Sequence, residues 1–241
     1  MCEPKSKTLP KTDMSRRHLL AFGAYAALTP WSMSIASATE TKAPINAISP
    51  AASLKRLMDG NARYAANTPD QRDFSANRAK LAQSQYPIAA ILSCADSRVA
   101  PELAFDQNAG DLFIMRVAGN VMSPDLLASL EYGVKFLGTP LVMVLGHTNC
   151  GAVSAAIDVI TEDAVLPGHL PGLISAIKPA VIEAKKENSA SLLSAAIAEN
   201  VRRQVAEIKL SQPIVNRFYD DQKIDIVGAV YDLQTGKISL V

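Results

Sequence analysis

Two short segments of this 241-residue chain carry side chains that could perform chemistry together. Cys94, Asp96 and Arg98 follow one run of apolar residues, and His147 and Cys150 follow another. Two cysteines and one histidine are one ligand short of the four that a structural zinc site requires, so a coordination position stays open to water. The residue types therefore predict a zinc ion that takes part in a reaction.

Cysteine usage favours metal binding over a disulfide framework. The chain has three cysteines, and Cys2 stands apart near the N-terminus, so Cys94 and Cys150 are the only pair. A secreted disulfide scaffold would have more cysteines at closer spacing in a shorter chain. Two buried apolar thiols would also explain the pair, but a core thiol needs no aspartate, arginine or histidine beside it.

Strand-like segments precede both groups of candidate ligands. The continuously apolar runs 87–94 and 141–147 are typical of central parallel strands that are covered on both faces. Two further strands are expected at 112–117 and 224–230. Because ligands gather at the carboxyl ends of parallel strands, residues as distant in sequence as Cys94 and His147 could meet at one ion.

Helical patterns alternate with these strands. They cover 53–66, 123–136, 152–160, 171–186 and 191–220, the last with a break expected near Pro213. Such alternation predicts one α/β domain with a mostly parallel central β-sheet flanked by α-helices. The length and the 49% hydrophobic content suffice for the core of a single large domain.

Charge excludes nucleic acid as an expected partner. The chain has 24 basic and 23 acidic residues, a net charge of +1, and no basic stripe interleaved with aromatic residues.

The N-terminus is typical of an export signal. Arg16 and Arg17 precede the apolar stretch 19–28, and small residues at 36–38 offer a cleavage site. The stretch is too short to span a membrane permanently. We predict a twin-arginine signal peptide at 1–38, a linker at 39–50, a catalytic domain at 51–241 and a periplasmic mature protein.

The chain resembles the β-class carbonic anhydrases. The family's zinc motif, Cys-x-Asp-x-Arg followed later by His-x-x-Cys, is present in full, and the likeness extends through 116–120 and Glu131-Tyr132 to cover residues 51–241. The resemblance implies one Zn²⁺ per chain, bound by Cys94, His147 and Cys150. It also implies reversible hydration of carbon dioxide to bicarbonate and a proton, by attack of a zinc-bound hydroxide.

The physical chemistry of the residues agrees with that reading. Two thiolates and one neutral imidazole balance the charge of Zn²⁺, and the complex still lowers the pKa of a bound water toward about 7. The resulting hydroxide suits a small electrophile such as carbon dioxide. Asp96 is close enough to orient the hydroxide, and Arg98 would keep Asp96 ionised and turned away from the metal. The resemblance further implies that Asp96 becomes the fourth ligand in a closed, inactive form.

The same resemblance, to the plant-like branch of the class, places the substrate pocket. It assigns Gln85, Phe113, Ala118 and Tyr132 to a small apolar wall, with several of them reaching across a dimer interface. A homodimer or homotetramer is therefore expected, although plain core packing would also explain Phe113 and Tyr132. A second branch has a tryptophan three residues before the first zinc cysteine, where it helps to bind inhibitory bicarbonate. Ile91 occupies that position here, so this form of inhibition is not expected.

Two other functions fit parts of the pattern. Hydrolysis of carbonyl sulfide or carbon disulfide could use the same metal site, and pocket size would discriminate between the substrates. A zinc-storing or redox-sensing protein without catalysis would need neither Asp96 nor Arg98, whose presence argues against that class.

Overall fold

The computed structural model describes residues 48–241 apart from residues 74, 76 and 188, so the predicted signal peptide lies outside the described residues. The strands are β1 (Ala89–Ser93), β2 (Leu112–Arg116), β3 (Leu141–His147), β4 (Asp225–Tyr231) and β5 (Ile238–Leu240). The helices are α1 (Pro50–Ala65), α2 (Arg78–Leu81), α3 (Pro101–Ala104), α4 (Pro124–Lys135), α5 (Gly151–Thr161), α6 (Leu170–Ser175), α7 (Lys178–Lys186), α8 (Leu192–Lys209) and α9 (Val215–Asp220), with a 3₁₀ turn η1 at Ala118–Asn120.

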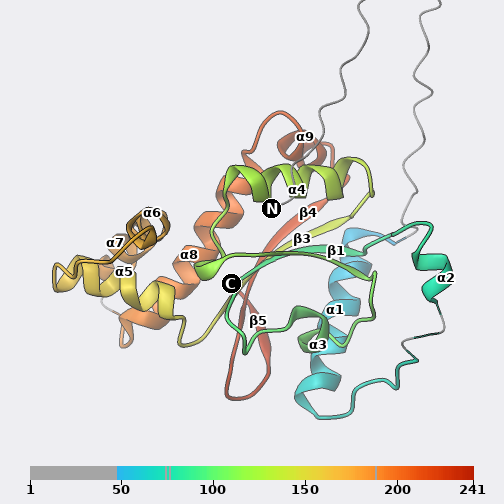
Figure 1. Cartoon of the computed structure of the whole chain (residues 1–241), viewed down its shortest axis with the longest axis horizontal. Coiled ribbons are helices and arrows are strands. Elements are labelled where there is room, and N and C mark those ends of the chain that lie inside the picture. Colours follow the sequence, from blue (N-terminus) through green and yellow to red (C-terminus); the bar gives the residue numbers. More distant parts are fainter. Residues whose placement is uncertain (1–47, 74, 76, 188) are drawn as a thin grey trace, which may run out of the picture. The chain divides into compact units, whose positions relative to one another are not determined.

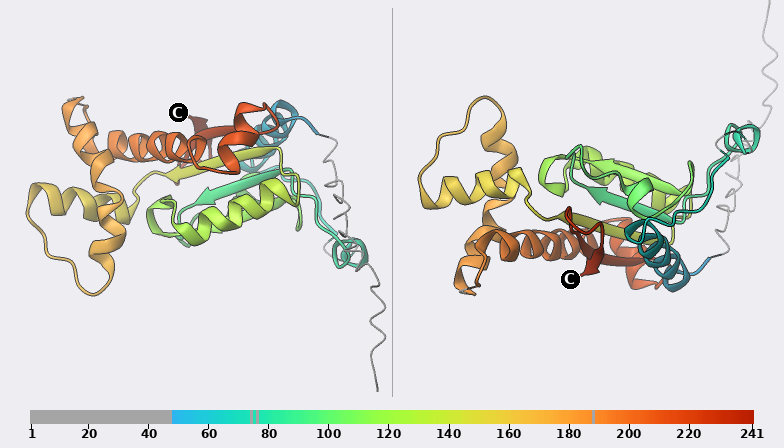
Figure 2. Two further views of the ribbon diagram at one scale, coloured as in Figure 1. Left: turned by 90° about the horizontal axis from the view of Figure 1, so that it is seen from above. Right: turned by 90° about the horizontal axis from the view of Figure 1, so that it is seen from below.

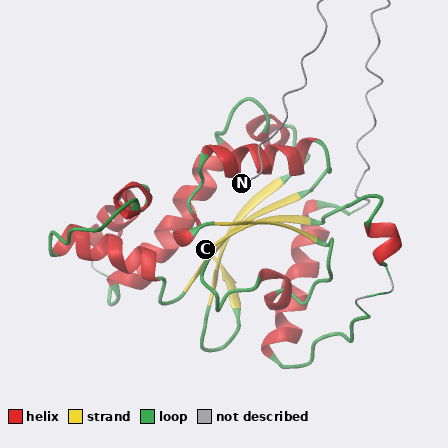
Figure 3. Cartoon of the chain, viewed as in Figure 1, coloured by secondary structure: helices red, strands yellow, loops and turns green. Residues whose placement is uncertain are grey.

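The five strands form one sheet in the order β2-β1-β3-β4-β5. Figure 3 shows the sheet in yellow among the helices. The first four strands run parallel, and β5 pairs antiparallel with β4 at the edge. Every residue of β1 and β3 is buried, as expected for apolar strands with helices on both faces. The predicted α/β architecture with a mostly parallel sheet is confirmed.

Alternate side chains of the central strands point to opposite helix layers. Ile91 and Met143 pack with Leu57 of α1 on one face. Leu92 and Val144 pack on the other face, against α4, α8 and α9 (Figure 1). Because successive side chains of a strand point to opposite faces of the sheet, the residues of each apolar run contribute alternately to the two cores.

A third apolar cluster lies beyond the carboxyl end of β3. It is formed by α5, α6 and α7 together with the first half of α8, which are drawn in yellow to orange in Figure 2. The cluster includes Cys94 and Cys150. The candidate ligands thus sit at the junction of the sheet and this helical group. In the part of the chain that the structure describes, no helix has the length and apolar character needed to cross a bilayer.

Helix α4 begins and ends where its sequence predicts. The Ser123 side chain accepts a hydrogen bond from the Leu126 N–H, and a proline occupies the first turn. Gly138, with φ +66°, follows the end of the helix.

Two long helical patterns are divided in the structure. The expected single helix at 171–186 is wrong, because the chain forms α6 and α7 with a break at Ala176–Ile177. Pro179 in the first turn of α7 explains the division, since proline is tolerated there but not in a helix interior. The break expected near Pro213 is confirmed between α8 and α9.

Candidate metal centre

Three candidate ligands meet where β1 and β3 end. Cys94 follows β1, His147 is the last residue of β3, and Cys150 directly precedes α5. Because Ser93 of β1 lies opposite Leu145 of the neighbouring β3, the two strands deliver their next residues to the same place. One ligand atom from each of the three residues lies within 4.8 Å of the others, and all three side chains are buried. This spacing is on the scale of two metal–ligand bonds of about 2.0–2.3 Å each.

The imidazole of His147 has one nitrogen ready for a ligand. Its Nδ1 lies 2.8 Å from the Thr148 carbonyl oxygen. That oxygen can only accept, so Nδ1 carries a proton, and in the neutral imidazole the lone pair is on Nε2. Nε2 is buried and has no hydrogen-bond partner among the described residues. A buried acceptor of this kind fits a metal ion, and the carbonyl partner of Nδ1 is the usual second contact of a metal-binding histidine.

The two cysteine thiols lie close together, and each shifts the pKa of the other. The hydrogen bond from Cys150 lowers the pKa of Cys94 to about 4, and the same pairing together with burial raises the pKa of Cys150. Both thiols are free of disulfide bonds. A cation that prefers sulfur would replace the thiol protons, because metal binding deprotonates cysteine. Two sulfurs and one imidazole suit Zn²⁺ better than the oxygen-preferring Mg²⁺ or Ca²⁺.

Asp96 and Arg98 form a bidentate ion pair beside the ligands. Arg98 Nε donates to Asp96 Oδ1 at 2.9 Å, and its Nη2 donates to Oδ2 at 2.7 Å. The Arg98 guanidinium holds the pKa of the Asp96 carboxyl well below its usual range. Asp96 Oδ2 lies 3.8 Å from His147 Nε2, so the carboxylate borders the cluster while both of its oxygens face the arginine. Its predicted role in orienting hydroxide stays a prediction.

Sequence reasoning assigned no role to Arg116, which braces the first ligand segment. Arg116 Nε donates to the Cys94 carbonyl at 3.0 Å, and its Nη2 donates to the Asp96 carbonyl at 2.6 Å. The guanidinium thus holds the backbone on both sides of Ala95. Its sequence signals were its place at the end of an apolar strand and in the segment 116–120, through which the family likeness extends.

Of the four predicted pocket residues, only Ala118 lies near the ligands within one chain. It precedes Gly119, whose N–H donates to Cys94 Sγ at 3.3 Å. Gln85 is exposed and precedes the amino end of β1, the opposite end of that strand from Cys94.

Phe113 and Tyr132 lie along the sheet and on its helix layer instead. Phe113 pairs with Ala90 near the start of β1, and its ring lies beneath Gly133 of α4. Tyr132, on the same helix, is 48% exposed and has its ring 5.5 Å from that of Phe136.

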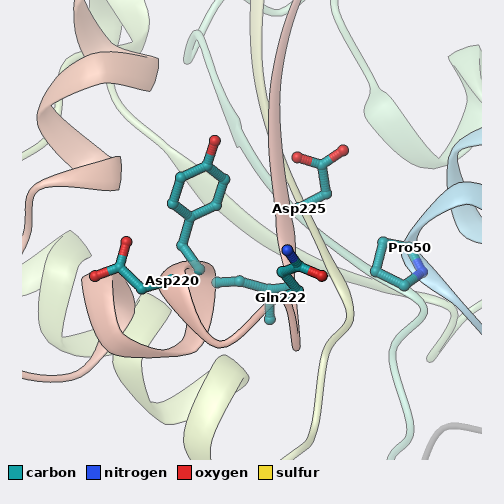
Figure 4. A pocket seen from close by; sticks show the side chains of 6 residues that line it. Pro50, Asp220, Gln222 and Asp225 are labelled. Carbon is teal, nitrogen blue, oxygen red and sulfur yellow. The ribbon is translucent and has the colours of Figure 1, made fainter.

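A cavity of about 480 Å³ lies at the other end of the sheet (Figure 4). It is lined by Pro50, Tyr219, Asp220, Gln222, Ile224 and Asp225. Asp225 begins β4, so this cavity is at the amino ends of the parallel strands, whereas the candidate ligands are at the carboxyl ends. It contains none of the predicted pocket residues.

Comparison with known proteins identifies the relatives of this chain. The carbonic anhydrase family profile matches residues 89–238. The carbonic anhydrase of Mycolicibacterium smegmatis is 36% identical over 192 residues, which cover 79% of this chain and 93% of that protein. The Coccomyxa β-carbonic anhydrase in complex with acetazolamide is 31% identical, with a TM-score of 0.62, and covers 78% of this chain and 86% of its own.

A tetrameric β-carbonic anhydrase of Sordaria macrospora shares the fold. It has a TM-score of 0.62 at 21% identity, and the match covers 78% of this chain and 96% of that one.

Proposed function

The chain belongs to the β-class carbonic anhydrases and hydrates carbon dioxide reversibly to bicarbonate and a proton; we propose that Zn²⁺ held by Cys94, His147 and Cys150 supports this reaction. The observation that carries the zinc proposal is the buried His147 Nε2, which has no partner among the described residues and lies within reach of two sulfurs. The family relationship favours hydration over the hydrolysis of carbonyl sulfide or carbon disulfide and over a role without catalysis.

The protein's own groups divide the work around the ion. Bound zinc would supply a Lewis acid that makes hydroxide available near neutral pH. The ionised Asp96 accepts a hydrogen bond from the attacking oxygen and so orients it toward carbon dioxide. Arg98 holds both Asp96 oxygens in place, and Arg116 holds the backbone that carries Cys94 and Asp96.

A second copy of the chain completes the substrate pocket in this proposal. Gln85, Phe113 and Tyr132 do not reach the Cys94 end of the sheet within one chain. Tyr132 of α4 and Phe136, the residue after that helix, form an exposed aromatic pair. Burial of these rings against a partner would be favourable, since exposed aromatic surface is common at protein interfaces. The protein is therefore proposed to be a homodimer or homotetramer, as its Sordaria structural neighbour is tetrameric.

Two finer assignments rest on the sequence. Gln85, Phe113 and Tyr132 at the matching positions support membership of the plant-like branch. Ile91 stands in place of the tryptophan of the other branch, and its side chain is fully buried in the core. Arg16 and Arg17, before the apolar stretch 19–28, support export to the periplasm by the twin-arginine route. Replacement of both arginines by lysine should leave the precursor in the cytoplasm, and undiminished mature protein in a periplasmic fraction would contradict the proposal.

Stopped-flow measurement of carbon dioxide hydration tests the proposed role of zinc. The protein should be purified, stripped of metal with a chelator and reloaded with Zn²⁺ or Mg²⁺. We expect one equivalent of zinc to restore hydration and magnesium to restore none. Full activity in the metal-free protein would refute the zinc proposal.

A further inference from the structure

Helix α8 contacts the metal centre indirectly, through a buried asparagine. Asn200 is 1% exposed, and its Nδ2 donates to the Gly119 carbonyl oxygen at 2.8 Å. A carbonyl oxygen can only accept, so the amide nitrogen must be the atom that faces it. This hydrogen bond joins residues 81 positions apart and anchors the η1 turn to α8.

Gly119 also contacts a ligand sulfur directly. Its N–H donates to Cys94 Sγ at 3.3 Å. Its φ of +74° favours glycine, and an added Cβ would lie 2.5 Å from Ile177 Cδ1. Since Asn200 fixes the carbonyl of the same residue, it also limits how far the N–H can turn away from the sulfur.

One turn further along α8, Gln204 holds the same segment without touching a ligand. Gln204 Oε1 accepts a hydrogen bond from the Met122 N–H at 2.6 Å. Both amides are buried, and both bind the backbone between residues 119 and 122. Only the Asn200 contact leads to Cys94, so Gln204 provides a matched control.

We propose that Asn200 is a positioning residue of the metal centre: it holds Gly119 so that the Gly119 N–H donates to Cys94 Sγ and tunes the electron donation of that sulfur to the metal. The inference rests on the proposed metal site. A hydrogen bond to a thiolate withdraws electron density from the sulfur, and groups that orient ligands from outside the coordination sphere change metal affinity measurably.

The sulfur-to-metal charge-transfer band of the Co²⁺-substituted protein tests the proposal. Asn200→Leu should shift this band to longer wavelength, because a sulfur without the hydrogen bond gives up an electron more easily. Competition with a chelator should show that the same variant binds the metal about tenfold more weakly than the wild type. Gln204→Leu should leave the band and the affinity unchanged, although it removes an equally buried amide.

Three results would overturn the proposal. An unchanged band in Asn200→Leu loaded with full cobalt would show that Asn200 does not act on the sulfur. An equal shift of the band in Gln204→Leu would show that any loss of a hydrogen bond to the turn has this effect, so that Asn200 has no specific role. Absence of any sulfur-to-cobalt band in the wild-type protein would refute the metal site itself, and this inference with it.

Asn200→Ser provides a second test, because serine keeps a polar side chain and changes the side-chain volume less than leucine does. Its hydroxyl is too short to reach the Gly119 carbonyl from the same backbone position, so the band should shift in the same direction as in Asn200→Leu. A wild-type band in Asn200→Ser would count against the proposal.

Discussion

Two buried polar groups of this protein, the Asp106 carboxylate and the Cys94–His147–Cys150 ligands, differ in whether their polar atoms have hydrogen-bond partners. Around Asp106, the carboxylate accepts from Arg63, from Arg72 and from the Asp70 N–H. Near it, all the polar atoms of the Asn61 amide are engaged, with the Ala104 and Gly236 carbonyls and the Ile238 N–H as partners.

The ligand cluster is incomplete by the same measure. His147 Nε2 has no hydrogen-bond partner among the described residues, and the sulfurs of Cys94 and Cys150 lie within 4.8 Å of the ligand atom of His147. Burial of an unpaired polar atom costs free energy, and an unpartnered imidazole nitrogen beside two thiols fits a site that binds an ion. The comparison teaches that groups of the chain itself satisfy the Asp106 carboxylate, whereas the Cys94 cluster leaves a buried acceptor open, as the proposed metal site requires.

Cys150→Ser should break the incomplete cluster with the largest effect. The remaining sulfur and imidazole cannot hold zinc tightly, so metal content should fall to near zero and hydration activity should disappear. Metal analysis and stopped-flow assays measure both. One zinc per chain with wild-type affinity in this variant would refute the assignment of ligands.

Asp106→Asn should break the complete cluster and leave the metal site intact. Two arginines would lose their charged partner, at a cost of about 3 kcal/mol in the free energy of unfolding. Asparagine tolerates the left-handed backbone at this position, where φ is +51°, so the effect is electrostatic. Urea unfolding measures the loss, and zinc content and activity should remain at the wild-type level.

The matched control for Asp106 is Asp59→Asn. Asp59 pairs with Lys55 on the exposed face of α1, and its side chain is 54% exposed. Such pairs contribute under about 1 kcal/mol, so this variant should unfold close to the wild type. An equal loss in both variants would show that burial of the ion pair does not matter.

Arg98→Ala should lower activity roughly 100-fold without loss of zinc, since one bidentate partner positions the Asp96 carboxylate. Freed from the arginine, the carboxylate is expected to bind the metal in place of water and close the site. X-ray absorption would then show an additional oxygen ligand from the protein. The double variant Arg98→Ala with Asp96→Asn should leave the fourth coordination position open to water again but remain poorly active. Near wild-type turnover in Arg98→Ala alone would show that the Asp96–Arg98 ion pair is an ordinary surface pair without a role in catalysis.

Of the predictions made here, a fall in pH should have the smallest effect: it should gradually reduce the contribution of the Asp106 ion pairs to the free energy of unfolding. Burial alone would raise the pKa of Asp106, but the Asp70 N–H and the arginines lower it below its ordinary value. A depressed carboxyl pKa gives stability that is present above the unfolded-state pKa of about 3.9 and is lost as pH falls through the folded-state value. The difference in unfolding free energy between wild type and Asp106→Asn should therefore shrink below about pH 4. A constant difference down to pH 2 would contradict the assigned cause.

Much of the fold could be predicted because apolar runs in a buried parallel sheet have a clear local signature. The run 141–147 is β3 residue for residue, and the N-cap at Ser123 is where the pattern indicates. The division of 171–186 was signalled by Pro179 but missed. The three-residue strand β5 is too short for periodicity to reveal, and only its pairing with β4 defines it.

By itself, the sequence determined which groups could do chemistry and that they follow strands: Cys-x-Asp-x-Arg after one apolar run and His-x-x-Cys after another. Ligand types and the i, i+2 spacing of Asp96 and Arg98 are local properties. The tertiary structure alone decided that β1 lies beside β3, which places Cys94 within 4.8 Å of its partner ligands. It also decided that Asn200, from a helix late in the chain, holds the Gly119 turn. Such contacts depend on strand order and helix packing, which local residue patterns do not encode.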